Sequence, residues 1–451
     1  MYKNQLPNLN NCNVGVIGLG YVGLPLALKI ANQKNCLKTQ KKLNRKIIGY
    51  DLSKFRIDQL KNGIDKNNIF NKKIIKETKN IIFTNNKNLL KNVDIFIITV
   101  PTPIDIENNP NLHFIKEASK IVGESIKSEE RRKTNPIVIY ESTVYPGVTE
   151  EICIPIIKEF SRKEYNSENF YKSFYSGYSP ERINPGDSEN TLDSIIKVTS
   201  GCNKKVSDWI DNFYGSIISA GTYKASSIKV AEAAKIIENT QRDINIALVN
   251  ELAILFKKMH INTKDVLNAA NTKWNFQEYV PGLVGGHCIG VDPYYLTYKA
   301  KEIGHNTKLI VAGREINNYM HEYLLNQIKI EIGRRKNIIK NEKVLLLGLS
   351  YKSNCGDIRN SQLISLVENM TMNKMEITIV DPKVNNQDLI NKKFVALDNI
   401  PENKKFSIII FALYHNEFKN IKEKTLACIS NKDTIIFDLT NTLSGSNIYN
   451  L

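Results

Sequence analysis

The sequence predicts an α/β protein made of two doubly wound, Rossmann-like domains that are joined by a long central helix. The first observation is that short apolar runs alternate with helix-like segments from residue 14 to about 223, and again after Arg314. Strands of a parallel sheet are covered on both faces, so they appear as continuous apolar runs bounded by polar turns. The second observation is a glycine-rich turn directly after the first run, and the third is a long stretch without glycine or proline between the two alternating regions.

The apolar runs place the strands. In the first region we expect strands at Val14–Ile17, Lys46–Tyr50, Ile81–Phe83, Asp94–Val100, Pro136–Glu141, Phe174–Tyr178 and Ile196–Thr199. In the second region we expect them at 344–348, 376–381, 406–412 and 434–439. The segment between helices that most resembles a loop, rich in glycine and proline, runs from Trp274 to Pro293.

A single helix is expected over residues 226–260. It begins with a serine suited to an N-cap and ends with Lys257 and Lys258, which the helix dipole favours. At 1.5 Å per residue it would span on the order of 50 Å, more than one domain needs. Its apolar side chains would be an aggregation liability on a monomer, so we expect a homodimer or a larger assembly. The expected domain boundaries are 1–223, 224–324 and 325–451.

Composition bounds the class of protein. A chain of 451 residues with 42% hydrophobic and 24% charged residues is typical of a soluble protein of more than one domain. The polar N-terminus does not resemble a signal peptide, and no apolar run is long enough to span a membrane. The seven cysteines are scattered and contain no CxxC pair. This pattern disfavours disulfides and structural zinc, and it favours the reducing cytoplasm.

The net charge of +16 raises the question of nucleic-acid binding. Lysines are spread along the whole chain beside many asparagines, and no zinc-finger, homeodomain or RNP pattern accompanies them. We therefore expect no nucleic-acid partner. A generally basic surface could still attract a small anionic substrate.

The glycine-rich turn predicts a dinucleotide site. Gly18, Gly20 and Gly23 form GxGxxG between a strand and a helix, which allows a tight turn, close approach to a pyrophosphate and close helix packing. Asp51 ends the second strand, where a carboxylate binds the ribose hydroxyls and selects NAD over NADP. The polar stretch at 32–46 is interpreted as a surface insertion that lengthens the connection to Asp51.

Other residues with chemical potential are far apart in the sequence. Cys288 lies in GLVGGHCIGVDPYY, with Asp292 four residues later; a buried, inert thiol is the alternative. Lys235 and Asn239 are spaced to share one face of the long helix, although a solvated helix stripe has the same spacing.

Three further side chains are candidates for ligand contacts. Thr143 and Glu181 each follow a predicted strand, at the edge of an open α/β sheet where ligands bind. Arg56 could stack on the adenine or be a plain solvated charge.

Together these segments resemble the UDP-glucose/GDP-mannose dehydrogenase family from Val14 to about Asn441. The matching motifs, in order, are GLGYVGLP, VPTP, ESTVYPG, SPER, AEAAKIIEN, GGHCIGVDP and GLSYKSNCGDIRNS. The segments GYSPERINPGD, TKWNF and GLVGGHCIGVDPYYL are most similar to the N-acetylhexosamine branch, the Vi-polysaccharide type of enzyme.

The resemblance implies that NAD twice oxidises C6 of a UDP-N-acetylhexosamine, giving the uronic acid for surface polysaccharide synthesis. Cys288 would capture the aldehyde as a thiohemiacetal, which becomes a thioester that water hydrolyses. Lys235 and Asn239 would stabilise the oxyanions. Asp292 would hold Lys235 or help to manage the proton.

The resemblance also assigns the remaining binding residues. Thr143 and Glu181 would position the water and transfer protons. The cofactor would be contacted by the glycine turn, by Asp51 and by Arg56. Further contacts would come from Tyr21, Val22, Thr102 and Thr143. The domain at 1–223 would bind NAD, and the domain at 325–451, which lacks GxGxxG, would hold UDP. The substrate would be bound by Lys235, Gly286, Arg314 and Lys352, with Asp357 and Arg359 shaping the diphosphate loop.

Some positions depart from the family or stay open. Glucose-type members carry a second glutamate where this chain has Pro185, so any role of that carboxylate is in doubt. His287 is expected to be structural or to contact substrate, and Arg314 could equally be salt-bridged. No metal-ligand spacing is visible, so no metal is expected.

Alternative functions differ from this one in substrate or in chemistry. Within the family the substrate could be UDP-GlcNAc, UDP-GalNAc, UDP-ManNAc or UDP-glucose. A single-step NAD dehydrogenase needs no thiol, and a non-enzymatic NAD-binding regulator would be expected to lose the chemical residues that this chain keeps. Two, one or no NADH per sugar would separate these three readings.

Overall fold

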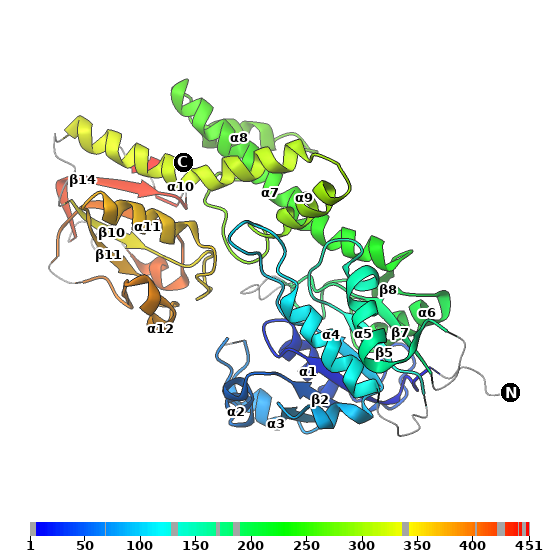
Figure 1. Ribbon diagram of the computed structural model, residues 1–451. Helices are drawn as coiled ribbons and strands as arrows, with labels where there is room; N and C mark the ends of the chain where they lie inside the picture. Colours follow the sequence, from blue (N-terminus) through cyan, green and yellow to red (C-terminus); the bar gives the residue numbers. More distant parts are fainter. Residues whose placement is uncertain are drawn as a thin grey trace. The chain divides into compact units, whose positions relative to one another are not determined.

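A computed structural model shows two compact α/β units, each built around its own sheet (Figure 1). One unit comprises Met1–Glu238 and Tyr294–Glu302, and the other comprises Asn239–Pro293 and Ile303–Leu451. The structure describes residues 6–67, 69–127, 134–167, 172–183, 190–335, 342–401, 404–421, 429–440, 442–443 and 448–450.

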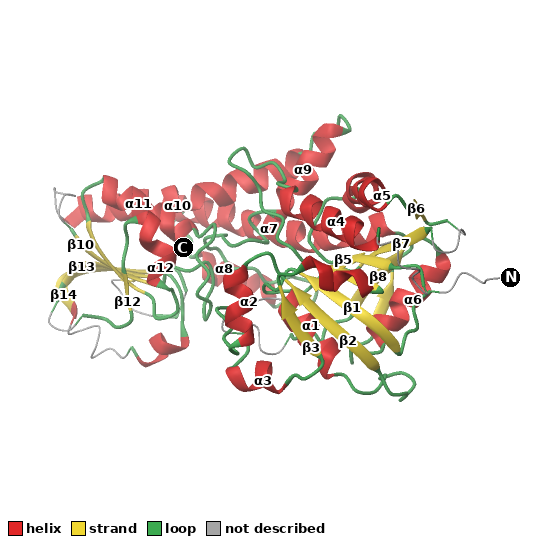
Figure 2. Ribbon diagram, turned by 60° about the horizontal axis from the view of Figure 1, so that its bottom comes forward, coloured by secondary structure: helices red, strands yellow, loops and turns green. Residues whose placement is uncertain are grey.

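The first unit contains a sheet in the order β3-β2-β1-β4-β5-β7-β8-β9, with β6 paired to β7 (Figure 2). Its strands are β1 (Asn11–Ile17), β2 (Asn44–Tyr50), β3 (Ile81–Thr84), β4 (Ile95–Ile98), β5 (Ile137–Tyr140), β6 (Glu164–Tyr165), β7 (Ser173–Tyr178), β8 (Lys197–Gly201) and β9 (Thr222–Lys224). The strands are parallel except where β8 runs antiparallel to β7. The parallel sheet expected from the apolar runs is found, and only its direction at this edge was not foreseen, because a run of apolar residues does not encode strand direction.

Helices cover both faces of this sheet. They are α1 (Gly23–Asn32), α2 (Lys54–Lys61), α3 (Lys72–Glu77), η1 (Lys87–Asn92), α4 (His113–Ile126), η2 (Val148–Cys153), α5 (Ile154–Ser161), α6 (Lys204–Gly215) and α9 (Asp292–Glu302). Apolar residues of α1, α2 and α6 pack in one core with inward-facing residues of the central strands. The stretch at 32–46 is not simply a surface insertion, because Cys36 and Leu43 are buried in this core.

The second unit contains a fully parallel sheet in the order β12-β11-β10-β13-β14-β15. Its strands are β10 (Lys343–Leu347), β11 (Glu376–Val380), β12 (Ala396–Leu397), β13 (Phe406–Phe411), β14 (Ser430–Asp438) and β15 (Ile448–Asn450). Its helices are α8 (Thr263–Asn271), α10 (Lys308–Arg335), α11 (Gln362–Met372), α12 (Asn386–Leu389), η3 (Ile390–Lys392) and η4 (Asn416–Asn420). Residues of α10 and α11 form the core on one face of the sheet.

The long helix is α7, Ile228–Lys258, which confirms the helix expected at 226–260. The carboxylate of Glu232 accepts hydrogen bonds from the backbone N–H groups of Gly147 and Thr149, at 2.6 and 3.0 Å, and so ties the first turns of α7 to the first unit. Among the described residues, no helix combines the length and the apolar character needed to cross a membrane. The α/β class with two Rossmann-like sheets and a long central helix is confirmed.

Candidate active site

The turn between β1 and α1 has the shape that a pyrophosphate needs. Gly18 has φ +92°, which side chains rarely adopt, and its N–H donates to the carbonyl of Tyr50 at 2.8 Å. A Cβ at Gly23 would lie 1.8 Å from the carbonyl oxygen of Gly18, so only glycine fits there. A Cβ at Gly20 would meet no atom within 4 Å, so the backbone is open at this position. Tyr21 and Val22 complete the turn before α1 begins.

Asp51 lies beside this turn, as predicted. Its Oδ2 accepts the N–H of Leu19 at 2.9 Å and its Oδ1 accepts the N–H of Ser53 at 2.9 Å. Arg56 is not the solvated charge that was one alternative. Its Nε donates to the carbonyl of Leu19 at 3.0 Å, and its Nη2 lies 2.8 Å from Asp65 in a buried ion pair. Asp51 and Arg56 therefore both brace the glycine turn, while contact between Arg56 and adenine stays a prediction.

Thr102 and Thr143 come together after β4 and β5. The Thr102 hydroxyl donates to the carbonyl of Thr143 at 2.6 Å, and the Tyr295 hydroxyl donates to the carbonyl of Thr102. Since the carboxyl ends of parallel strands are the ligand-binding edge of such a sheet, both threonines lie where the resemblance places cofactor contacts.

Glu181, just after β7, belongs to a buried group of charged and polar side chains. Its Oε1 accepts the N–H groups of Arg182 and Ile183 at 2.7 and 2.8 Å, and its Oε2 accepts from Lys197 Nζ at 3.0 Å. Lys197 also donates to Glu141 at 2.8 Å. Sequence reasoning did not single out Lys197 or Glu141. A lysine within a short strand that is otherwise uncharged was the available signal for the first of them. Pro185 lies outside the described residues.

Cys288 lies in a turn that leads directly into α9. Its carbonyl accepts the N–H groups of Val291 and Asp292, at 3.0 and 2.8 Å. Cys288 is partly exposed, so it is not the buried cysteine of the alternative, and its reactivity stays a prediction. Asp292 is buried, and its Oδ2 accepts from Asn239 Nδ2 at 2.5 Å. The structure therefore joins Asn239 of α7 to the cysteine turn through Asp292.

Lys235 lies one helical turn before Asn239 on α7. Its side chain is buried, with 8% exposure, which excludes the alternative of a solvated lysine on an exposed helix stripe. The expected contact between Asp292 and Lys235 stays a prediction.

His287, next to Cys288, has charged neighbours from the second sheet domain. Its Nδ1 lies 3.5 Å from Asp357 Oδ2 and 3.4 Å from Arg359 Nη2, and Arg359 pairs with Asp357 at 2.5 Å. Burial lowers the pKa of His287, but hydrogen bonds with Asp357 and Cys288 outweigh it and raise the pKa to about 9. Burial likewise opposes ionisation of Asp357, yet the hydrogen bonds from His287 and Arg359 hold the pKa of this carboxyl well below its usual range.

The other predicted substrate residues belong to the second unit. Gly286 has φ +87°, and a Cβ there would lie 2.7 Å from the ring of Tyr351, so the turn before His287 packs closely on the loop after β10. Lys352 is in that same loop. Arg314 is buried and pairs with Asp243 at 2.6 Å, which is the salt-bridged alternative; its contact with a diphosphate stays a prediction.

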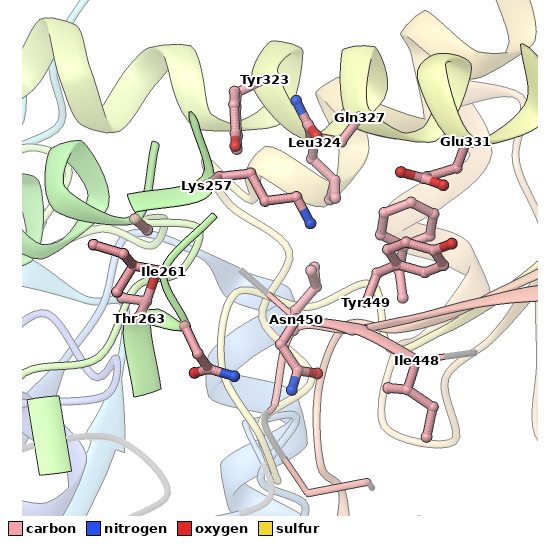
Figure 3. A pocket seen from close by; sticks show the side chains of 14 residues that line it. Lys257, Ile261, Thr263, Tyr323, Leu324, Gln327, Glu331, Ile448, Tyr449 and Asn450 are labelled. Carbon is pink, nitrogen blue, oxygen red and sulfur yellow. The ribbon is translucent and has the colours of Figure 1, made fainter. Parts of the chain in front are cut away.

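A pocket elsewhere in the second unit lies between the end of α7, α10 and β14–β15 (Figure 3). Lys257, Tyr323, Gln327 and Tyr449 line it, and Lys257 Nζ lies 5.5 Å from the centre of the Tyr449 ring. None of the predicted site residues lines this pocket, so it forms no part of the candidate active site. Within the described parts of the chain, no group of histidine, cysteine and acidic residues is arranged to hold a metal ion.

A doubly wound domain with this glycine turn and an acidic residue at the end of β2 defines a dinucleotide-binding protein. Three segments match the UDP-glucose/GDP-mannose dehydrogenase family: its NAD binding domain at residues 12–218, its central domain at 229–319 and its UDP binding domain at 345–445. The chain belongs to this family, and it is an NAD-dependent UDP-sugar dehydrogenase.

Relatives and a solved structure agree over nearly the whole length. The chain is 43% identical to a UDP-N-acetyl-D-glucosamine 6-dehydrogenase of Pseudomonas aeruginosa, covering 96% of this chain and 97% of that protein. It is 42% identical to a protein of the same name from Salmonella typhi, with the same coverage of 96% and 97%. The structure of a UDP-D-ManNAc dehydrogenase from Pyrococcus horikoshii superposes with a TM-score of 0.82 at 27% identity, covering 97% of this chain and 98% of that one.

Proposed function

We propose that this enzyme oxidises the C6 hydroxyl of a UDP-N-acetylhexosamine twice, to the uronic acid, through a covalent intermediate on Cys288. The observation that carries the proposal is the cysteine turn, in which a partly exposed thiol is followed by Asp292 bound to Asn239 of α7. Cys288 supplies a nucleophile, and Asp292 fixes the amide of Asn239. The same chain also has the glycine turn that binds NAD.

The first oxidation removes a proton from O6 and a hydride from C6. NAD, when bound, supplies the hydride acceptor for both oxidations. Lys235 and Asn239 stabilise the oxygen at C6 while its negative charge grows, because an ammonium and an amide that are already in place need no reorganisation. Asp292 keeps the Asn239 amide oriented through its 2.5 Å hydrogen bond.

The thiolate of Cys288 then attacks the aldehyde carbon, and the carbonyl oxygen takes up a proton to give the thiohemiacetal. Loss of a second hydride and of the hydroxyl proton converts it into a thioester. Water attacks the thioester carbonyl, the C–S bond breaks, and the uronate leaves with Cys288 restored. Thr143 and Glu181 position this water, and the Glu181 carboxylate takes its proton.

The choice of an N-acetylhexosamine as the substrate is supported by the relatives. Two UDP-N-acetyl-D-glucosamine 6-dehydrogenases at 42 and 43% identity favour UDP-GlcNAc, with UDP-GalNAc as a related substrate. The mannosamine epimer is the second candidate, because the Pyrococcus enzyme shares the fold along the whole chain. Lys352 and Gly286, with Arg314, are proposed to bind the UDP-sugar, and surface polysaccharide synthesis in the cytoplasm is the proposed use of the product.

The domain roles and the assembly are further parts of this proposal. The three matched segments support a division at 1–223 for NAD, 224–324 for the central helices and 325–451 for UDP. A homodimer built on α7 is supported by its exposed apolar residues, among them Ile237 at 58% and Leu248 at 53% exposure. Light scattering should give at least a dimer, and a stable monomer at working concentration would contradict this part.

A panel of nucleotide sugars tests the reaction. With NAD in excess, the enzyme should release two NADH for each UDP-N-acetylhexosamine consumed and should leave GDP-sugars untouched. One NADH per sugar would indicate a single oxidation, and no NADH with any member of the panel would remove the assignment.

A further inference from the structure

A cluster of buried charges lies at the end of the first sheet where β5 and β7 finish and β8 begins. Glu141, Glu181, Lys197 and Tyr214 are 2%, 8%, 3% and 0% exposed. Lys197 Nζ donates to Glu141 Oε2 at 2.8 Å, to Glu181 Oε2 at 3.0 Å and to the carbonyl of Pro180 at 3.1 Å. The Tyr214 hydroxyl donates to the other oxygen of Glu141.

This network fixes the position of the Glu181 carboxylate. An ammonium has three donors, and all three of Lys197 are in use. Glu181 receives two backbone N–H groups on Oε1 and Lys197 on Oε2, so about one of its four lone-pair sites remains for a further donor such as water. The carboxylate therefore has one free acceptor position and little freedom to rotate.

Stability alone does not explain the cluster. Two carboxylates share one ammonium, so the cluster carries a net charge of −1 when both carboxylates are ionised. Burial raises the pKa of Glu141, although the pairing with Lys197 opposes this effect. Buried ion pairs are frequently no more stable than apolar residues of the same volume. A buried ammonium that fixes the orientation of a carboxylate, by contrast, contributes to catalysis if that carboxylate accepts a proton during the reaction.

We propose that Lys197 is a positioning residue, which holds Glu181 in place for the hydrolysis of the thioester on Cys288. This inference rests on the proposed function, in which Glu181 takes the proton of the attacking water. Glu141 and Tyr214 hold Lys197 from the opposite side. Removal of Lys197 should therefore impair the water step and leave the two oxidations, which do not use this proton transfer, nearly intact.

The test separates oxidation from hydrolysis in the full-length enzyme with UDP-GlcNAc and NAD. Rapid mixing measures the burst of NADH per active site, steady-state turnover measures hydrolysis, and intact mass detects the sugar nucleotide attached to the protein. The variants are Lys197→Met, Lys197→Gln and Lys197→Arg, with Glu181→Gln as the reference for a lost proton acceptor. Lys197→Gln keeps N–H donors and serves if the methionine variant does not fold.

Thr199→Val is the matched control. Thr199 is fully buried on the same strand, two residues beyond Lys197, and its hydroxyl donates to Asp211 at 3.0 Å. This variant removes a buried polar contact of β8 without touching the cluster. It should lower the melting temperature, while the ratio of NADH burst to steady-state turnover stays that of wild type.

Lys197→Met or Lys197→Gln should keep the NADH burst, lose about a hundredfold in steady-state turnover and accumulate the covalent adduct, and Glu181→Gln should behave in the same way. Lys197→Arg should recover part of the turnover. If Glu181→Gln accumulates the adduct but no Lys197 variant does, the positioning role is wrong and the proposed function stands. If Glu181→Gln itself hydrolyses at the wild-type rate, the assigned role of Glu181 fails. Burst and turnover that fall together in the lysine variants would identify a purely structural residue.

Discussion

The two sheet domains start with the same backbone device and use it differently. In the first, Gly18 has φ +92° and its N–H donates to the last residue of β2; in the second, Gly348 has φ +94° and donates to the last residue of β11, both at 2.8 Å. Each second strand is followed by an aspartate that accepts the N–H after the glycine, from Leu19 at 2.9 Å and from Leu349 at 2.8 Å. The frame is thus common to both domains.

The two aspartates differ in what remains free on them. Asp51 is partly exposed, with Leu19 and Ser53 as its backbone donors. Asp381 is fully buried, where it accepts three backbone N–H groups, from Leu349, Ser350 and Lys383, and lies 3.3 Å from His415. The Asp51 carboxylate can still accept hydrogen bonds from ribose hydroxyls. The Asp381 carboxylate instead uses its acceptor positions to stabilise its own loop.

The helices that follow the turns differ as well. α1 begins at Gly23, close behind Gly18, so its N-terminus faces the glycine turn. α11 begins only at Gln362, after a loop that packs on the cysteine turn, where Tyr351 lies against Gly286. The comparison shows how one strand–glycine–aspartate frame gives a phosphate cradle in one domain and a fixed loop in the other.

The largest effect should come from removing the buried aspartate. Asp381→Ala would leave His415 Nε2 and three backbone N–H groups without their acceptor, and each buried donor left unsatisfied costs about 1–3 kcal/mol. Urea unfolding should show this loss, while NAD affinity, measured by calorimetry, should not change. If Asp381→Ala weakened NAD binding and left the stability unchanged, the roles given to the two domains would be contradicted.

Two glycines of the first turn allow the effect on protein stability to be separated from the effect on cofactor binding. Gly23→Ala forces a Cβ to within 1.8 Å of a backbone oxygen and should destabilise the protein by about 1–3 kcal/mol. Gly20→Ala meets open space and should leave the melting temperature unchanged, yet reduce NAD affinity because its methyl group occupies the approach to the backbone. Equal melting temperatures for the two variants would contradict this geometry.

Cofactor choice depends on Asp51. Because a carboxylate at this place repels the 2′-phosphate of NADP, Asp51→Ala should weaken the preference for NAD on the order of tenfold, the factor that about 1.4 kcal/mol produces. The ratio of kcat/KM for the two cofactors is the measurement. Comparable values for NAD and NADP in the unaltered enzyme would remove the assignment of Asp51 to the ribose.

The smallest effect is a pH dependence at His287. Its pKa in the folded protein, about 9, lies above the ordinary 6.5, so the stability from its charged contact with Asp357 is complete below pH 6.5 and is lost as the pH rises through 9. Asp357→Asn should therefore lower the melting temperature most at the acid end of this range. A residual, pH-independent loss should remain from the pair with Arg359.

The control for this effect is the His287→Gln background. There the change of melting temperature caused by Asp357→Asn should no longer vary between pH 6.5 and 9, because the titrating partner is absent. A pH dependence that persists in this background would assign it to another group.

The local features could be predicted from the sequence. The apolar runs gave the central strands of both sheets, and the helix expected at 226–260 is found at Ile228–Lys258. Short edge strands such as β12 and β15 were missed, since two or three residues carry little hydrophobic pattern. The antiparallel direction of β8 was missed too, because it depends on how the chain returns to the sheet.

Within the site, residue types were predictable and their partners were not. Asp292 was expected to hold Lys235 or to help manage the proton, and no motif revealed its partner in the structure, Asn239, one turn further along α7. Arg56 was either an adenine contact or a solvated charge, and its buried partner, Asp65, is a residue that no motif marks. Lys197 and Glu181 are neighbours only because β7 and β8 lie side by side, a tertiary relation that no spacing along the chain reveals.

The central claim is that Cys288 carries the sugar covalently between the two oxidations. The most direct measurement is the rate at which Cys288→Ser forms the uronic acid from UDP-GlcNAc and NAD, with binding of both ligands checked by calorimetry. A serine hydroxyl is a far weaker nucleophile near neutral pH, so the account predicts unchanged binding and a loss of at least about a thousandfold in turnover. Uronic acid formed at close to the wild-type rate would show that the thiol does not take part.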